Sequence, residues 1–282
     1  MKTILLPFYD DDVSRRAFEL AAQIVKPVGG HVEGLFVLRR PQILDGGEGD
    51  MLADSHFAEL EEECRHAAGR ARTRFEACAA AQNLPMAAGV GRANEASAGW
   101  REIEGMEEYV LGSHGRLFDL ILMGREFGRS WLNWRVLAES ALFESGRPVL
   151  LAPDAPGSTC CENVVIAWNA STETARTVAF AMPLLARAHN VTVLSVEGWG
   201  VPGPAGEECA TYLARAGIAA TARTIMRGRH SPAEAVLNEC ARSGADLLVK
   251  GAYTQSRLRQ LIFGGATRHI LAHAQLPVIL AN

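Results

Sequence analysis

The chain has 282 residues, 48% of them hydrophobic and 21% charged, so it is long enough to bury the cores of two ordinary globular domains. Its formal net charge of −4 gives no basic footprint, which argues against a nucleic-acid partner. No apolar window approaches the roughly 20 residues that span a bilayer, and the start, MKTILLPFYDDD, lacks the apolar core and cleavage site of a signal peptide. We therefore expect a cytoplasmic protein without membrane insertion.

The predicted strands and helices occur in the same order in the two halves of the chain. Short apolar runs predict strands, and each first strand is followed by a longer run with helical periodicity. In chain order the first half gives KTILLPF (2–8), the helical segment 14–25, HVEGLFVL (31–38), FDLILMG (118–124) and RPVLLAP (147–153). The second half repeats them as NVVIAWN (163–169), the helical segment 172–188, NVTVLSVE (190–197), ADLLVKG (245–251) and LPVILAN (276–282).

Strands that alternate with helices predict βαβ units, a parallel sheet and helices on both of its faces. The fold class is therefore α/β, with two tandem doubly wound domains. We place the first domain at residues 1–153, a linker rich in small residues and proline at 154–162, and the second domain at 163–282. In such domains ligands bind beyond the carboxyl ends of the strands.

The first half also carries an insertion, residues 39–84. Its glycine- and aspartate-rich beginning predicts a loop, and the part after Asp54 predicts a long amphipathic helix. The loop is either a lid or partner-binding element, or a solvated connection.

The residues that follow two strands of the second half predict a ligand site. After 163–167, Asn169 suits an adenine edge or a ribose hydroxyl, or else a turn, and Ser171 or Thr172 can cap the next helix. The run 245–251 ends at Gly251, which allows a ligand to approach the backbone closely, and Gly264 and Gly265 open a helix whose backbone N–H groups can face an anion. Hydroxyl and guanidinium groups along this segment can bind a triphosphate: Ser256, Arg257, Arg259, Thr267 and Arg268. The alternative is that the glycines make turns and the arginines a solvated face.

These two segments, residues 164–177 and 251–280, resemble the universal stress protein family, and the resemblance extends over both halves. It implies Rossmann-like domains of the adenine nucleotide alpha hydrolase-like type, each a five-stranded parallel sheet flanked by helices. The ATP-binding subgroup has a motif G-x2-G-x9-G followed by a small residue. Gly251, Gly264 and Gly265 match it, but Thr254 replaces the second glycine and either closes the loop or binds phosphate through its hydroxyl.

The resemblance implies a site for ATP or another adenine nucleotide, with which Mg²⁺ can bind. The implied nucleotide-binding residues are Ala167, Trp168, Asn169, Val196, Gly251, Thr254, Ser256, Arg257, Gly264, Gly265, Ala266 and Thr267. Asn169 stands where the family places an aspartate.

The first half departs further from the motif. It keeps Gly124, but alignment from the shared Pro-Val pair puts Arg135 and Val136 where Gly264 and Gly265 stand. We predict a degenerate copy without nucleotide, in which Trp131, Trp134 and Arg135 close the pocket or form a contact surface.

No catalytic constellation is found, and no metal site is predicted. His269 and His273 have a metal-ligand spacing but lack a third ligand, and we interpret them as packing residues. The six cysteines are interpreted as reduced thiols, with the vicinal Cys160 and Cys161 either redox-active or incidental.

The leading hypothesis is a stress-response module that binds an adenine nucleotide in its second half and signals to an unidentified protein partner. The alternatives are an interaction protein without nucleotide and a slow ATPase. Because the last strand of each half is apolar, we expect these strands to be paired or covered, giving an intramolecular pseudo-dimer and allowing a homodimer.

Overall fold

The computed structural model describes residues 1–39, 50–87, 94–125, 134–154, 157, 159–252 and 265–282, with backbone only for 50–57. The chain divides into two compact units, Lys2–Ser145 and Gly146–Asn282, and Met1 groups with the second. The division precedes the predicted linker because the short strand Val149–Leu151 belongs by its contacts to the second unit.

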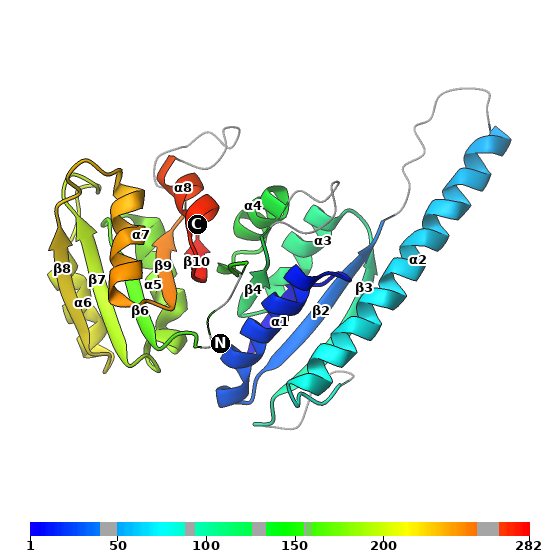
Figure 1. Cartoon of the computed structure of the whole chain (residues 1–282), viewed down its shortest axis with the longest axis horizontal. Helices are drawn as coiled ribbons and strands as arrows, with labels where there is room; N and C mark the ends of the chain where they lie inside the picture. The colour runs from blue at the N-terminus through cyan, green and yellow to red at the C-terminus, as the bar shows by residue number, and fades with distance from the viewer. Residues whose placement is uncertain (40–49, 88–93, 126–133, 155–156, 158, 253–264) are drawn as a thin grey trace. The chain divides into compact units, whose positions relative to one another are not determined.

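The first unit is a parallel sheet with the strand order β3-β2-β1-β4. Its helices α1 and α2 lie on one face, and α3 and α4 lie on the other (Figure 1). This arrangement follows from right-handed crossovers, since the chain runs outward from β1 to β3 and then returns to the other side of β1. The elements are β1 (Thr3–Pro7), α1 (Asp12–Val25), β2 (His31–Leu38), α2 (Asp50–Ala81), β3 (Ser97–Glu104), α3 (Glu107–His114), β4 (Leu120–Met123) and α4 (Trp134–Glu144).

The second unit repeats this plan, and its strand order is β5-β10-β9-β6-β7-β8. All its pairings are parallel except β5 with β10, which is antiparallel and joins the last strands of the two sequence repeats. The strand order reverses between β6 and β9. The elements are β5 (Val149–Leu151), β6 (Asn163–Ala167), α5 (Thr172–Leu185), β7 (Asn190–Val196), α6 (Gly206–Arg215), β8 (Ala220–Ile225), α7 (Pro232–Ser243), β9 (Leu247–Gly251), α8 (Gly265–His273) and β10 (Val278–Ala281).

These strands confirm the predicted α/β class and its repetition. The expected pairing of the last strands is present as β5 with β10, whereas an intramolecular pseudo-dimer of the two halves stays a prediction. The antiparallel pairing lies between the last strands of the two repeats, and every other pairing described above is parallel, as predicted. Because β5 and β10 pair with each other, neither apolar strand is left as an unpaired edge on that side.

An aspartate at the start of the fourth strand of each repeat fixes the first strand of that repeat. Asp119 accepts hydrogen bonds from the backbone N–H groups of Lys2 and Thr3, at 2.6 and 3.1 Å. Asp246 accepts them from Glu162 and Asn163, at 3.1 and 2.9 Å. The repeated aspartate of FDLILMG and ADLLVKG therefore has a structural role, because it pairs backbone donors that precede the sheet ladder.

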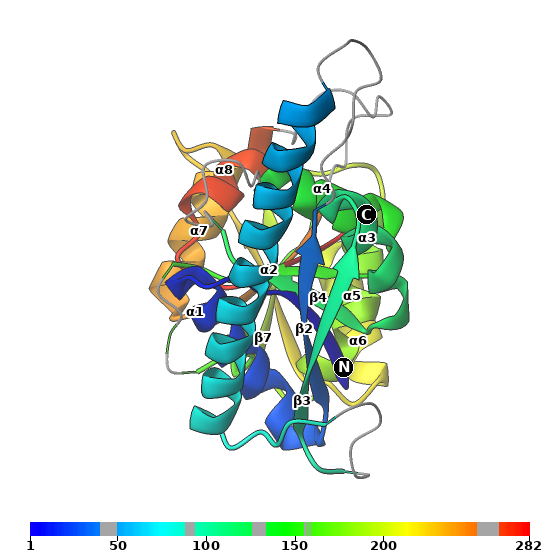
Figure 2. The ribbon, with the colours of Figure 1, turned by 90° about the vertical axis from the view of Figure 1, so that its right-hand side faces the viewer.

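The insertion forms α2, which runs along β2 and β3 of the first unit (Figure 2). The helix begins at Asp50, five residues before the predicted start at Ser55. Phe75 of α2 is fully buried and packs edge-on against Phe8, directly after β1, and Phe18 of α1. Its ring also lies 5.4 Å from the ring of Trp100 in β3. The predicted loop that precedes it lies outside the described residues.

Among the described helices, each is either too short or too polar to cross a membrane.

Candidate functional site

The candidate site of the second unit lies where β6 and β9 end, at the point where the strand order reverses. In open α/β sheets this is the position at which ligands bind. Five buried polar side chains gather at these strand ends and at the first turns of α5 and α8. We call them the β6–β9 polar cluster: Asn169, Ser171, Thr174, Lys250 and Thr267.

Asn169 belongs to the cap of α5. Its Oδ1 accepts a hydrogen bond from the hydroxyl of Thr174 at 2.6 Å and from the backbone N–H of Ser171 at 3.3 Å. Ser171 is the N-cap, as one of the two predicted candidates, and its Oγ accepts from the N–H of Thr174 at 3.2 Å. The side-chain oxygen of Asn169 is therefore engaged in the turn, which is one of the two roles that the sequence left open.

Gly251 is required for packing between β9 and α5. A Cβ atom at this position would lie 2.5 Å from the backbone nitrogen of Thr174 and 2.6 Å from its Oγ1. Gly124 is in the same situation in the first unit, where a Cβ would lie 2.2 Å from Cγ1 of Val13. The sequence suggested that Gly251 lets a ligand approach the backbone; the structure gives a helix–strand contact as the physical reason for this glycine.

Three further residues of the implied nucleotide site, Ala167, Trp168 and Val196, are buried at the ends of β6 and β7. Ala167 ends β6 and Val196 ends β7. The Trp168 ring is 7% exposed, and its Nε1 donates to the carbonyl of Pro204 at 2.9 Å. The segment after β7 is thus attached to the end of β6 through the indole.

The first turn of α8 is open above Gly265. A Cβ added there would meet no atom of the described residues within 4 Å. Ala266 is half-buried, and Thr267 is buried in the polar cluster. The backbone N–H groups of this turn point away from the helix body, as anion binding requires.

Lys250 was not identified from the sequence. It lies in β9 with its side chain 3% exposed, and its Nζ donates to the Gly251 carbonyl at 2.7 Å and to Oγ1 of Thr267 at 2.8 Å. Burial lowers the pKa of Lys250 from 10.5 to about 8, although the charge of Glu173 opposes this shift. Alignment of the two repeats would have pointed to Lys250, because it is a lysine in an otherwise apolar strand and Met123 stands at its position in the first repeat.

Several predicted site residues, namely Thr254, Ser256, Arg257 and Gly264, lie outside the described residues, as do Arg259 and Trp131. Their roles stay predictions.

The corresponding edge of the first unit is occupied by the chain's own side chains. Tyr9 follows β1 at the position of Asn169, is 2% exposed, and packs on Phe36. Its hydroxyl donates to Oε1 of the buried Glu107 at 3.2 Å, and Arg39 donates to Oε2 of the same carboxylate at 2.5 Å.

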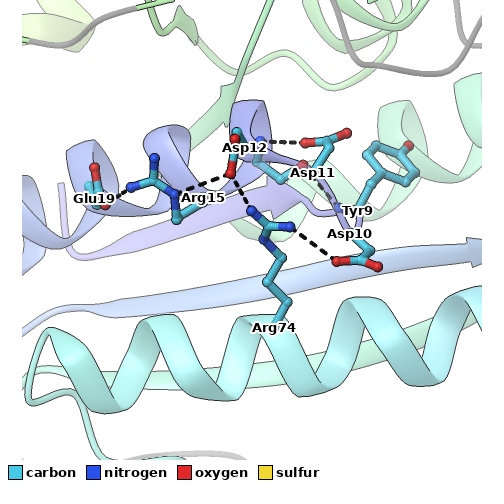
Figure 3. Close-up of polar contacts among 8 residues, drawn as sticks. Tyr9, Asp10, Asp11, Asp12, Arg15, Glu19 and Arg74 are labelled. Atoms are coloured by element: carbon cyan, nitrogen blue, oxygen red, sulfur yellow. Dashed lines mark hydrogen bonds and ion pairs between the residues drawn. The ribbon is translucent and has the colours of Figure 1, made fainter.

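The acidic residues that follow Tyr9 are paired with arginines of α2 (Figure 3). Arg74 contacts Asp10 at 3.2 Å and also pairs with Asp12, while Asp11 caps α1 through the N–H of Ser14 at 2.7 Å. An open groove of about 730 Å³ lies beside them along α2, with Arg74 and Asp10 in its wall. These pairings leave the groove's charges largely compensated.

The degenerate motif of the first unit is carried by the start of α4. Trp134 is buried, and the Arg135 guanidinium lies 5.4 Å from its ring centroid. Val136 is 44% exposed at the position of Gly265. Bulky side chains thus stand where the second unit has glycine.

The histidine and cysteine pairs show ordinary packing. The rings of His269 and His273 stack at 4.2 Å, and no group of three or more His, Cys, Asp or Glu in the described part of the chain is arranged to hold a metal ion. The thiols of Cys160 and Cys161 lie 3.1 Å apart. This hydrogen bond and burial raise the pKa of Cys160 well above its ordinary value, which disfavours the reactive thiolate.

Comparison with known proteins identifies the second unit. The model of the universal stress protein family matches residues 161–282. The second half of this chain belongs to that family. A curated relative, the stress response protein NhaX of Bacillus subtilis, is 37% identical over 58 residues, which are 21% of this chain and about a third (34%) of that protein.

Solved universal stress proteins share the fold of the whole chain. A universal stress protein from Archaeoglobus fulgidus matches 99% of this chain with 96% of its own length, at a TM-score of 0.65 and 17% identity. A protein of unknown function from Pseudomonas aeruginosa matches 100% of the chain with 92% of its own, at a TM-score of 0.52 and 14% identity. At these identities the likeness shows the tandem fold alone.

Proposed function

We propose that the second, universal stress protein unit is a regulatory module that binds ATP or a related adenine nucleotide at the carboxyl ends of β6 and β9. Occupancy of this site is passed to a protein partner in the cytoplasm. The first unit, whose equivalent edge is occupied by Tyr9 and Glu107, binds no nucleotide and serves association. Any Mg²⁺ would come with the phosphates of the nucleotide.

The observation that carries the proposal is the first turn of α8 beside the strand switch point. Gly265 is exposed, a Cβ added to it would meet no atom of the described residues within 4 Å, and the buried Lys250 is hydrogen-bonded to Thr267 of the same helical turn. Open backbone donors and a positive charge at a helix N-terminus suit a phosphate group. The family membership of residues 161–282 and the match of Gly251, Gly264 and Gly265 to the motif support the same ligand.

Calorimetric titration of the full chain with ATP tests the proposal, with Gly265→Val as the informative variant. Because a Cβ at Gly265 would meet no atom of the described residues within 4 Å, we expect valine to leave the fold of these residues intact and to clash with a ligand at the first turn of α8. Gly69→Val is the matched control, since Gly69 also lies in a helix with open space around its Cβ. We expect Gly265→Val to abolish ATP binding and Gly69→Val to leave it unchanged. Absence of ATP binding to the native chain would refute the proposal.

One observation favours a second candidate, an interaction module that binds no nucleotide. The Asn169 side-chain oxygen is already bound within the cap of α5, and the Trp168 indole is bound to Pro204. Under this alternative the polar cluster only stabilises the sheet edge. Mass spectrometry of small molecules released from gently purified protein separates the two, because co-purified adenine nucleotide excludes the second candidate.

A further inference from the structure

Lys250 joins the end of β9 to the first turn of α8. Its ammonium lies between the Gly251 carbonyl, at 2.7 Å, and the Thr267 hydroxyl, at 2.8 Å. Both acceptors are neutral, and an ammonium has three donors. Among the described residues, the Lys250 Nζ therefore has one donor beyond these two bonds, at the turn where the backbone N–H groups of α8 begin.

The charge of Lys250 has no counter-ion among the described residues. No described carboxylate forms an ion pair with it; Glu173 acts on it only as a nearby charge. A buried charge without a partner is costly, so such groups normally pair with an ion or a ligand. The position of this ammonium thus indicates an anion beside it.

The fold itself does not require this lysine. In the first repeat Met123 stands at the equivalent position, four residues after the aspartate and directly before the glycine. The residue equivalent to Thr267, at the same distance from the shared Pro-Val pair, is Ala138. Met123 and Ala138 are both fully buried, so the same packing is achieved without polar atoms. The second repeat has both the lysine and the threonine, and the first repeat has neither.

The first turn of α8 adds a second source of positive potential. The aligned peptide dipoles give a helix N-terminus a partial positive charge, which acts in the same direction as the ammonium. The Lys250 Nζ reaches this turn through Thr267. Two cationic features, the Lys250 ammonium and the helix N-terminus, therefore lie at the first turn of α8.

We propose that Lys250 is an anion-binding residue whose ammonium, positioned by Thr267, contacts a phosphate group of the bound nucleotide. The inference rests on the proposed function and names the part of the ligand that this side chain recognises. If Lys250 contacts a phosphate group, part of the affinity for the nucleotide comes from the phosphate charge. We therefore expect the protein to bind phosphorylated adenylates more tightly than the nucleoside. If Lys250 were only a structural tie between β9 and α8, the nucleotide and the nucleoside would respond alike to its removal.

The test compares native protein with Lys250→Met, which restores the side chain of the first repeat. Full-length protein is titrated with ATP, with adenosine and with inorganic tripolyphosphate. Lys26→Met is the matched control, because it removes one exposed lysine charge from the first unit. Thermal unfolding verifies that each variant folds, and Lys250→Gln replaces Lys250→Met if the latter does not.

We expect Lys250→Met to weaken ATP and tripolyphosphate roughly 10- to 100-fold, the range of one hydrogen bond to a charged group. Adenosine binding and the Lys26→Met protein should be unchanged. Equal ATP affinity in the native and Lys250→Met proteins would overturn the assignment of Lys250 and leave the proposed function intact. If the native protein binds tripolyphosphate in a Lys250-dependent way but does not bind ATP, the proposed nucleotide site is rejected and the anion site at Lys250 is retained. Absence of both ligands from the native chain would overturn both proposals.

Discussion

Replacing Lys250 with methionine should stabilise the second unit while it weakens ligand binding. Burial lowers the pKa of Lys250 from 10.5 to about 8. Since each pKa unit corresponds to about 1.4 kcal/mol, keeping this ammonium charged in the folded chain costs roughly 3 kcal/mol at neutral pH. Loss of the hydrogen bonds to Gly251 and Thr267 offsets part of the gain. We therefore expect Lys250→Met to raise the free energy of unfolding by about 1–2 kcal/mol.

The stability difference between the native protein and Lys250→Met should depend on pH. Between about pH 8 and pH 10.5 the unfolded chain keeps the Lys250 proton and the folded chain loses it, so native stability rises with pH through this window. The methionine variant lacks this rise. The stability difference between the two proteins should therefore be largest below about pH 8 and shrink toward pH 10.5.

Urea unfolding of both proteins at about pH 7 and about pH 9.5 measures this difference. A Lys250→Met protein that is less stable than the native chain at neutral pH would refute this prediction, as would a stability difference that does not shrink at the higher pH. A ligand-free sample is required, because a bound anion would stabilise the native protein alone.

The other predictions concern the residues around Lys250 and Asp119, which accepts hydrogen bonds from the backbone at the start of β1. Gly251→Ala should destabilise by about 1–3 kcal/mol, because its Cβ would clash with the backbone of Thr174; unchanged urea midpoints would contradict this. Thr267→Val should weaken ATP binding in the native background and have a much smaller effect when Lys250 is already methionine, as a double-mutant cycle by calorimetry would show. Although burial opposes it, hydrogen bonds from two backbone N–H groups lower the pKa of Asp119, so its stabilisation is present above the ordinary value of 3.8 and is lost as pH falls below it. Asp119→Ala should cost about 1 kcal/mol at neutral pH and less in acid, and an equal cost at both pH values in urea unfolding would exclude this explanation.

The architecture could be predicted because it depends on local patterns that occur twice. Apolar runs separated by helical periodicity specify parallel strands with crossovers, and Ser171 at the start of α5 is a cap that needs only its own neighbours. Ser231 and Pro232 at the start of α7 and Gly244 after its end follow the same local capping rules. These features do not depend on distant contacts.

The site was less predictable because its side chains meet only in the folded chain. The sequence does not show that Thr174 lies against Gly251, or that Thr267 accepts a hydrogen bond from Lys250, which is 17 residues away in the sequence. The same limit applies to the first repeat. Tyr9 looks like a strand-end aromatic residue, and only tertiary packing places its hydroxyl on Glu107.

Titration of the native full chain with ATP by calorimetry, with Gly265→Val and Gly69→Val run in parallel, tests the central claim most directly. We expect one ATP to bind per chain, binding to be lost in Gly265→Val, and binding to be retained in Gly69→Val. No ATP binding by the native chain, or equal binding by all three proteins, would contradict a nucleotide site at the first turn of α8.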